Sequence, residues 1–149
     1  MNRKEKRKIR KEIEMFSNVV TIIKQYFPFL IEKLDKLTDT RHQSYVEYTM
    51  ATITVTRLLG LLCGIKSMRE TTKVFNTEET IQNIANLLEI ELEETPHYDT
   101  INEVFENLEI EELRKIQKYM VQKLIRSKMF DKCRYKGKYF QIVVDGTGI

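Results

Sequence analysis

One aspartate near the end of the sequence stands where it could bind a metal ion. Asp145 follows an apolar run at 142–144 and precedes the turn residues Gly-Thr-Gly. The run predicts a buried strand, which would fix the carboxylate at the edge of a sheet. Carboxylate oxygens there can bind Mg²⁺ or Mn²⁺, and pairs of these ions catalyse hydrolysis and transfer of phosphodiesters. Asp145 is therefore a candidate catalytic residue and metal ligand, although such chemistry needs at least two further acids.

The same residues allow other interpretations. Asp-Gly is a favoured turn pair, and an aspartate in a turn commonly bonds nearby backbone amides. The stretch VVDGTG also resembles the DxDGT loop of haloacid-dehalogenase-like phosphatases, but Val143 occupies the position of the nucleophilic aspartate. Valine cannot act as that nucleophile. The Asp-Thr-Gly motif of aspartic proteases is not matched, because the order here is Asp145-Gly146-Thr147.

The charges of the chain fall into blocks, although the net charge is only +3. Residues 1–11 contain seven Lys or Arg and one acid, residues 70–112 contain thirteen acids and one base, and residues 114–138 contain ten bases and one acid. Basic blocks can neutralise phosphates, but they are also typical of ordinary solvated helix faces. For DNA contact we select Arg3, Lys4, Arg7, Lys8, Lys115, Lys118, Lys123, Arg126, Arg134, Lys136 and Lys138.

Length and composition favour one helix-rich domain. The chain has 149 residues, 42% of them hydrophobic, with only five Gly and two Pro. No signal-peptide pattern is present, and the longest apolar stretch, at 58–65, is far too short to span a bilayer, so we expect no membrane partner. Cys63 and Cys133 lack metal-ligand spacing, which favours a reducing, cytoplasmic setting.

Apolar periodicity predicts where the helices lie. Residues 4–27 carry an apolar stripe, Pro28 interrupts it, and a second stripe follows at 30–37. Residues 45–64 are apolar nearly all round, which predicts the central helix of the fold. Residues 110–129 predict an amphipathic helix with its apolar side at Leu113, Ile116, Met120 and Leu124 and a basic outer arc.

Capping signals predict where three further helices begin. Ser67 with Glu70 forms a capping box, and Asn76 or Thr77 can cap the helix that follows. A second capping box, Thr100 with Glu103, predicts the start of a short helix. His97 beside Asp99 could suggest a catalytic or metal dyad. We expect it instead to cap or pack in a turn, because no second His or Cys stands at ligand spacing.

After Phe130 the sequence becomes rich in aromatic and β-branched residues. CRYKGKYFQIVVD (133–145) contains a Gly137 turn and predicts a strand or a small hairpin. Tyr119, before this segment, and Tyr135 and Tyr139, within it, are interleaved with bases. Such a surface could grip or stack on DNA, although packing explains most tyrosines. The predicted fold class is mainly α: a multi-helix N-terminal bundle followed by a short C-terminal β-strand or hairpin.

Several stretches, in order, resemble one family, the DDE-type insertion-sequence transposases. The helical stretch 38–75 is similar to their N-terminal region, and 95–113 is similar to a Pro-x-x-Asp-Thr segment that leads into a short helix. FQIVVDGTGI then falls where these enzymes have their first catalytic strand. The matching residues are Asp39, Arg41, Tyr48, Gly64, Ser67, Pro96, Asp99, Thr100, Phe105 and Asp145.

The resemblance implies a ribonuclease H-like catalytic domain that is truncated after its first strand. By this match residues 1–130 are a helical, DNA-binding region, and residues 131–149 begin the catalytic domain with Asp145 as its first acid. The full enzyme would use Mg²⁺ or Mn²⁺ to cleave and transfer DNA at insertion-sequence ends. The second Asp and the Glu would lie beyond residue 149, so we expect this chain alone to be inactive and to bind no metal stably.

A different class of function is also open. The chain could be a non-catalytic helical interaction protein that binds a partner, or a second copy of itself, through its apolar C-terminal strand. A homo-oligomer is possible under either interpretation.

Overall fold

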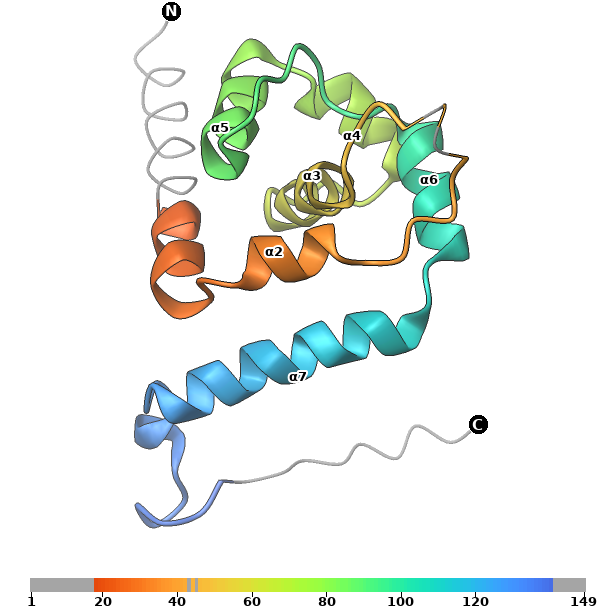
Figure 1. The fold of residues 1–149 in the computed structure, drawn as a ribbon. Coiled ribbons are helices and arrows are strands. Elements are labelled where there is room, and N and C mark those ends of the chain that lie inside the picture. Colours follow the sequence, from red (N-terminus) through yellow and green to blue (C-terminus); the bar gives the residue numbers. More distant parts are fainter. Residues whose placement is uncertain (1–17, 43, 45, 141–149) are drawn as a thin grey trace, which may run out of the picture.

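The protein is a mainly helical fold, seen here in a computed structural model that describes residues 18–42, 44 and 46–140 (Figure 1). A helical stretch at 18–26 is followed by helices packed around a central one. The elements are α2 (Leu30–Asp35), α3 (Met50–Leu62), α4 (Met68–Phe75), α5 (Glu78–Leu88), α6 (Tyr98–Asn107), α7 (Ile110–Arg126) and the short 3₁₀ helix η2 (Asp131–Cys133). The predicted mainly α class is confirmed.

Helix α3 forms the centre of the fold, as its sequence predicted. It contacts α2, α4, α5 and α6, and ten of its thirteen residues are buried (Figure 1). Ile53, Val55 and Leu59 are almost completely enclosed. Its buried threonines remain satisfied because they bond to the helix itself: the hydroxyl of Thr54 donates to the carbonyl of Met50 at 2.6 Å, and that of Thr56 to Thr52 at 2.7 Å.

The predicted start of α3 was too early. The helix begins at Met50, because the side chain of Thr49 caps it by accepting a bond from the backbone N–H of Thr52 at 3.2 Å. The residues just before Thr49 have another role, since the carbonyl of Tyr48 accepts a bond from the guanidinium of Arg41 at 2.8 Å. A tertiary contact therefore replaces the first predicted turn.

Two of the predicted helix starts are confirmed. Ser67 and Glu70 form the expected capping box at α4, and Thr77 caps α5. Asn76 has a different partner: its side-chain oxygen accepts bonds from the N–H and hydroxyl of Thr95 at 3.0 and 3.1 Å. The break at Pro28 is also confirmed, because residues 28–29 form a turn between the first helical stretch and α2.

The predicted capping box at Thr100 is wrong. Helix α6 begins at Tyr98, and His97 is its N-cap, with Nδ1 accepting from the backbone N–H of Asp99 at 3.4 Å. The earlier start is fixed from outside the helix: the hydroxyl of Thr72 on α4 accepts from the N–H of Tyr98 at 2.8 Å. The expectation that His97 caps or packs in a turn is confirmed.

The segment after α7 contains no strand as far as residue 140. Helix α7 ends at Arg126, three residues before the predicted end, and is followed by η2. Tyr135 and Tyr139 then pair in a single antiparallel bridge around Gly137, which is the minimum of a hairpin. The remainder of the predicted strand, at 141–145, lies outside the described residues.

Candidate nucleic-acid interface

Helix α7 lies along α2 and below the other labelled helices, and a small set of contacts holds it there (Figure 1). Near its start, the carboxylate of Glu112 accepts bonds from the N–H and hydroxyl of Thr38 at 3.0 and 2.8 Å. These bonds lower the pKa of Glu112. Further along, the Tyr119 hydroxyl accepts from the N–H of Phe29 at 3.2 Å.

The inner side of α7 is the predicted apolar one. Ile116 is buried, and Leu113, Met120 and Leu124 pack partly against the core. Because this stripe faces α2, the basic residues of the helix are left on the outside. Lys115, Lys118 and Arg126 are exposed, as the sequence predicted.

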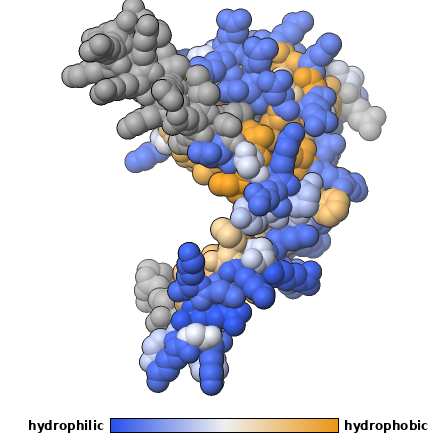
Figure 2. All heavy atoms as spheres, turned by 90° about the vertical axis from the view of Figure 1, so that its left-hand side faces the viewer, coloured by the Kyte–Doolittle hydropathy of each residue, from blue (hydrophilic) through white to orange (hydrophobic). Residues whose placement is uncertain are grey.

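The outer surface of this part of the molecule is mainly hydrophilic, although Val121, Ile125 and Met129 are also exposed on it. Figure 2 shows hydrophilic side chains covering most of its lower part, where the end of α7 and the residues after it lie. Exposed bases continue past the helix at Lys136 and Lys138. Among the described residues, none of the exposed bases Lys115, Lys118, Arg126, Lys136 and Lys138 is in an ion pair. We call these five bases the basic arm; one of them, Lys136, also lies 5.3 Å from the ring centre of Tyr135.

Two other predicted contact residues are engaged within the protein. Arg134 pairs with Asp131 at 2.8 Å and also lies over the ring of Phe140. Lys123 is partly buried, with its ammonium 5.9 Å from the ring centres of both Phe29 and Tyr119. Each of them therefore shares its charge with a neighbour and presents less of it to solvent.

The opposite side of the molecule is acidic and does not suit a phosphate backbone. A cavity of about 510 Å³ lies between the start of α3 and the loop after α5, and its lining includes Glu47, Glu91, Glu93 and Glu94. Burial, together with Glu47 and Glu94, raises the pKa of the Tyr48 hydroxyl in its wall to about 12. The sequence showed the acidic block but not that this loop forms a cavity.

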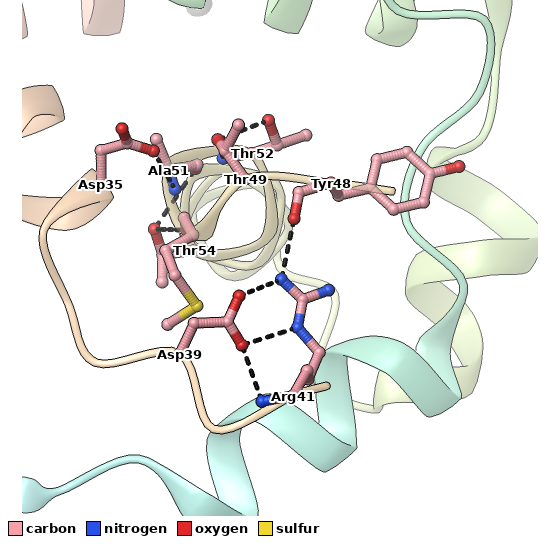
Figure 3. A network of polar contacts seen from close by, with 9 residues as sticks. Asp35, Asp39, Arg41, Tyr48, Thr49, Ala51, Thr52 and Thr54 are labelled. Atoms are coloured by element: carbon pink, nitrogen blue, oxygen red, sulfur yellow. Dashed lines mark hydrogen bonds and ion pairs between the residues drawn. The ribbon is translucent and has the colours of Figure 1, made fainter. Parts of the chain in front are cut away.

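The motif residues that carried the family resemblance serve mainly to build the fold. Asp39 binds Arg41 through both carboxylate oxygens, at 2.9 and 2.6 Å, and Arg41 also reaches the carbonyl of Tyr48 (Figure 3). Gly64 ends α3 with a positive φ of 83°, and Ser67 caps α4. None of these roles requires a bound substrate.

Sequence reasoning overlooked Arg57, which is buried in α3. Its guanidinium donates to the carbonyls of Ile65 and Lys66 at 3.3 and 2.9 Å, and approaches the hydroxyl of Thr71. Arg57 therefore ties the connection between α3 and α4 to the centre of the fold. The sequence feature that could have indicated this buried role is the presence of a single arginine within an otherwise apolar helix.

The remaining predicted site residues lie outside the described part of the chain. They are Arg3, Lys4, Arg7, Lys8 and Asp145. Within the described residues, no three His, Cys, Asp or Glu side chains are grouped closely enough to hold a metal ion. The apolar segment on which the interaction-protein alternative depends, 142–144, is outside as well. The metal site and that alternative both stay predictions.

Comparison with known families defines the class of this protein. Residues 31–120, well over half of the chain, match a family model for a region associated with DDE-type transposases. The chain belongs to this family, DDE_Tnp_1-associated. No curated protein and no solved structure matches the chain. Among the described residues, no helix has the length and apolar character needed to cross a membrane.

Proposed function

We propose that this chain acts in DNA transposition and binds the DNA of insertion-sequence ends through its basic arm. The observation that carries the proposal is the position of these bases, on the exposed side of α7 and in the segment after η2, in a chain that belongs to a transposase-associated family. DNA would bind on the α7 side of the molecule, because the acidic cavity and the acidic block at 70–112 would repel a phosphate backbone.

The geometry of α7 suits contact with several phosphates. Lys115 and Arg126 are eleven residues apart, which corresponds to about 16 Å along a helix axis. Lys118 lies between them on the same outer side, and Lys136 and Lys138 extend the charge beyond the helix. A row of unpaired cations of this kind gains affinity by releasing counterions from DNA, without reading its sequence. Arg3, Lys4, Arg7 and Lys8 would add a second set of phosphate contacts.

Asp145 would supply the first of three acidic ligands in a ribonuclease H-like domain. Mg²⁺ or Mn²⁺, held there with two acids from the full-length enzyme, would activate the attacking oxygen for cleavage of a DNA strand. The described residues contain no cluster of three or more His, Cys, Asp or Glu side chains that could hold such an ion. The coding sequence downstream tests this part of the proposal, which requires two further acids in frame, borne on predicted strands.

Binding to duplex DNA at several salt concentrations tests the interface. We expect affinity to fall steeply with salt, with a log–log slope of about −0.9 for each phosphate contacted. The double variant Lys115→Gln/Lys118→Gln should reduce the magnitude of the slope by about one for each phosphate that a lysine no longer neutralises. These side chains are exposed, so the fold should survive both substitutions.

A charge-matched control separates the proposed interface from net charge. Lys66 and Lys73 are exposed but belong to the α3–α4 side of the molecule. Lys66→Gln/Lys73→Gln removes the same two charges and should leave the slope unchanged. Equal slopes for the two double variants, or wild-type affinity that is indifferent to salt, would count against the proposal. Solution mass measured on the same samples gives the oligomeric state.

A further inference from the structure

The turn at the end of the described chain holds two tyrosines side by side. The backbone N–H of Tyr135 donates to the carbonyl of Tyr139 at 2.7 Å, and the N–H of Tyr139 donates back at 3.2 Å. Residues paired in this way across an antiparallel bridge point their side chains to the same face, with Cβ atoms about 5 Å apart. The two phenol rings therefore project from the same face of the turn.

A tight turn fixes this pair. Lys136 and Gly137 both have positive φ, 51° and 67°, and the N–H of Lys138 donates to the carbonyl of Tyr135 at 3.2 Å. Positive φ at both central residues is typical of a type I′ turn at 135–138. The bridge pairs Tyr135 with Tyr139, so the loop between the two tyrosines has one residue more than a two-residue hairpin loop. A lysine in this conformation costs more than a glycine would, so the turn is held at some local strain.

Both rings are open to solvent, and a cation lies beside the ring of Tyr135 and beside that of the neighbouring Phe140. Tyr135 is 59% exposed and Tyr139 is 65% exposed, and the next residue, Phe140, is 41% exposed. The Lys136 ammonium lies 5.3 Å from the ring centre of Tyr135, and the Arg134 guanidinium 4.9 Å from that of Phe140. Across 132–140 the sequence has four bases and no acid. Large exposed aromatic side chains in such a setting mark an interaction surface.

The chemistry of this surface narrows the choice of ligand. Alternating aromatic rings and cations match single-stranded nucleic acid, in which bases offer faces for stacking and phosphates offer charge. Bases inside a duplex are already stacked on their neighbours and cannot use the rings. A neutral apolar partner would gain nothing from the four cations.

We propose that Tyr135 and Tyr139 stack on unpaired bases of single-stranded DNA, while Lys136 and Lys138 bind the adjoining phosphates. This inference rests on the proposed function, and it adds a preference that phosphate contact alone does not supply. Arg134, the residue before Tyr135, is held in place because it lies over the ring of Phe140 and pairs with Asp131. Lys115, Lys118 and Arg126 of the basic arm would hold duplex DNA, and the tyrosine pair, with Lys136 and Lys138, would hold an opened strand next to it.

The experiment compares two double variants of the full chain that differ only in whether the side chain can stack. Tyr135→Phe/Tyr139→Phe keeps both rings, whereas Tyr135→Leu/Tyr139→Leu keeps apolar bulk without an aromatic face. The probe is an oligothymidylate of about 12 nucleotides, within the range of known single-strand site sizes. Loss of stacking should weaken binding by at least about fivefold for each ring, and the Phe variant should stay within about twofold of wild type.

Duplex DNA distinguishes failure of this inference from failure of the proposed function. The Leu variant should bind duplex with wild-type affinity and salt slope, because it keeps every charge. Three results would overturn this inference: the Leu and Phe variants bind the single strand equally well, the Leu variant loses as much affinity for duplex as for the single strand, or wild type does not bind the single strand. If the salt slope on duplex still depends on the lysines, the proposed function survives these results. If the Leu variant instead loses self-association and keeps its single-strand affinity, the pair is a protein contact. Salt-indifferent duplex binding overturns the proposed function itself.

Discussion

Asp39 and Arg41 form the most enclosed ion pair among the described residues, and their value is structural. The side chain of Arg41 is only 4% exposed and that of Asp39 is 24% exposed. Together with the carbonyl of Tyr48, the pair connects the residues after α2 to those that lead into α3 (Figure 3). Removing one member of such a pair leaves the other charge buried and uncompensated.

We expect Asp39→Asn to lower the free energy of unfolding by about 2–4 kcal/mol, because Arg41 would lose its counter-charge. Chemical denaturation measures the change. The matched control is Glu32→Gln, which breaks the exposed pair between Glu32 and Lys36 and should leave the unfolding midpoint where it is. An Asp39→Asn protein as stable as wild type would show that the ion pair does not hold this junction.

The same pair gives a pH dependence. The bonds from Arg41 lower the pKa of Asp39 below its ordinary value of 3.8. A carboxyl group whose pKa is lowered in the folded state stabilises the fold above its unfolded pKa and loses this effect as the pH falls. The difference in unfolding free energy between wild type and Asp39→Asn should therefore be constant near neutral pH and shrink below pH 3.8. A difference that grows with acid would contradict the assignment.

At the scale of the helices, the C-terminal ends of α3 and α5 have the same capping geometry, but a different residue type adopts the left-handed conformation in each. After α3, Ile65 and Gly64 donate to the carbonyls of Gly60 and Leu61 at 2.9 and 3.0 Å, with Gly64 in the left-handed conformation. After α5, Ile90 donates to Ala85 at 3.1 Å, but the left-handed residue is Glu89, with φ of 58°. Glycine is favoured at this position because it has no Cβ to clash.

We expect Glu89→Gly to raise the free energy of unfolding by up to about 1 kcal/mol, because it relieves the left-handed strain. The loss of the exposed contact between Glu89 and Lys24 should offset little of this. Gly64→Ala is the reverse change at the equivalent position and should destabilise by about 1–2 kcal/mol. An added Cβ at Gly64 has no atom within 4 Å, so backbone strain would be the only cause. Thermal and chemical unfolding of both variants should give opposite signs.

At the scale of the whole molecule, the charges are separated onto two sides. The acidic block at 70–112 covers α5, α6 and the loop between them and ends with Glu111 and Glu112 in the first turn of α7, whereas unpaired bases follow the outer side of the rest of α7. At physiological salt the field of an exposed charge falls off over about 8 Å, so the two sides act largely independently. DNA should therefore meet one side only.

A lysine-modification footprint checks this orientation. In the presence of duplex DNA, acetylation of Lys115, Lys118 and Lys138 should become slower than in its absence. Lys66 and Lys73, on the α3–α4 side, should react at the same rate with and without DNA. Equal protection at all five positions would indicate non-specific coating, and protection of Lys66 and Lys73 alone would place DNA on the other side.

The sequence by itself determined the features that depend on residues a few positions apart. The helix-rich class, the apolar stripe of α7, the cap at Ser67 and the break at Pro28 all followed from local spacing and side-chain type. Helical hydrogen bonds and caps join residues three or four positions apart, so a linear pattern contains the necessary information. The basic outer side of α7 followed for the same reason.

Only the tertiary structure decided the features that join distant residues. Thr72 sets the start of α6 from 26 residues away, and Asn76 binds Thr95 across 19 residues. The enclosure of Arg57 and the acidic cavity likewise need elements that meet only after folding. A sequence pattern states which bonds a residue can make, but the choice among distant partners is made when the helices pack around α3.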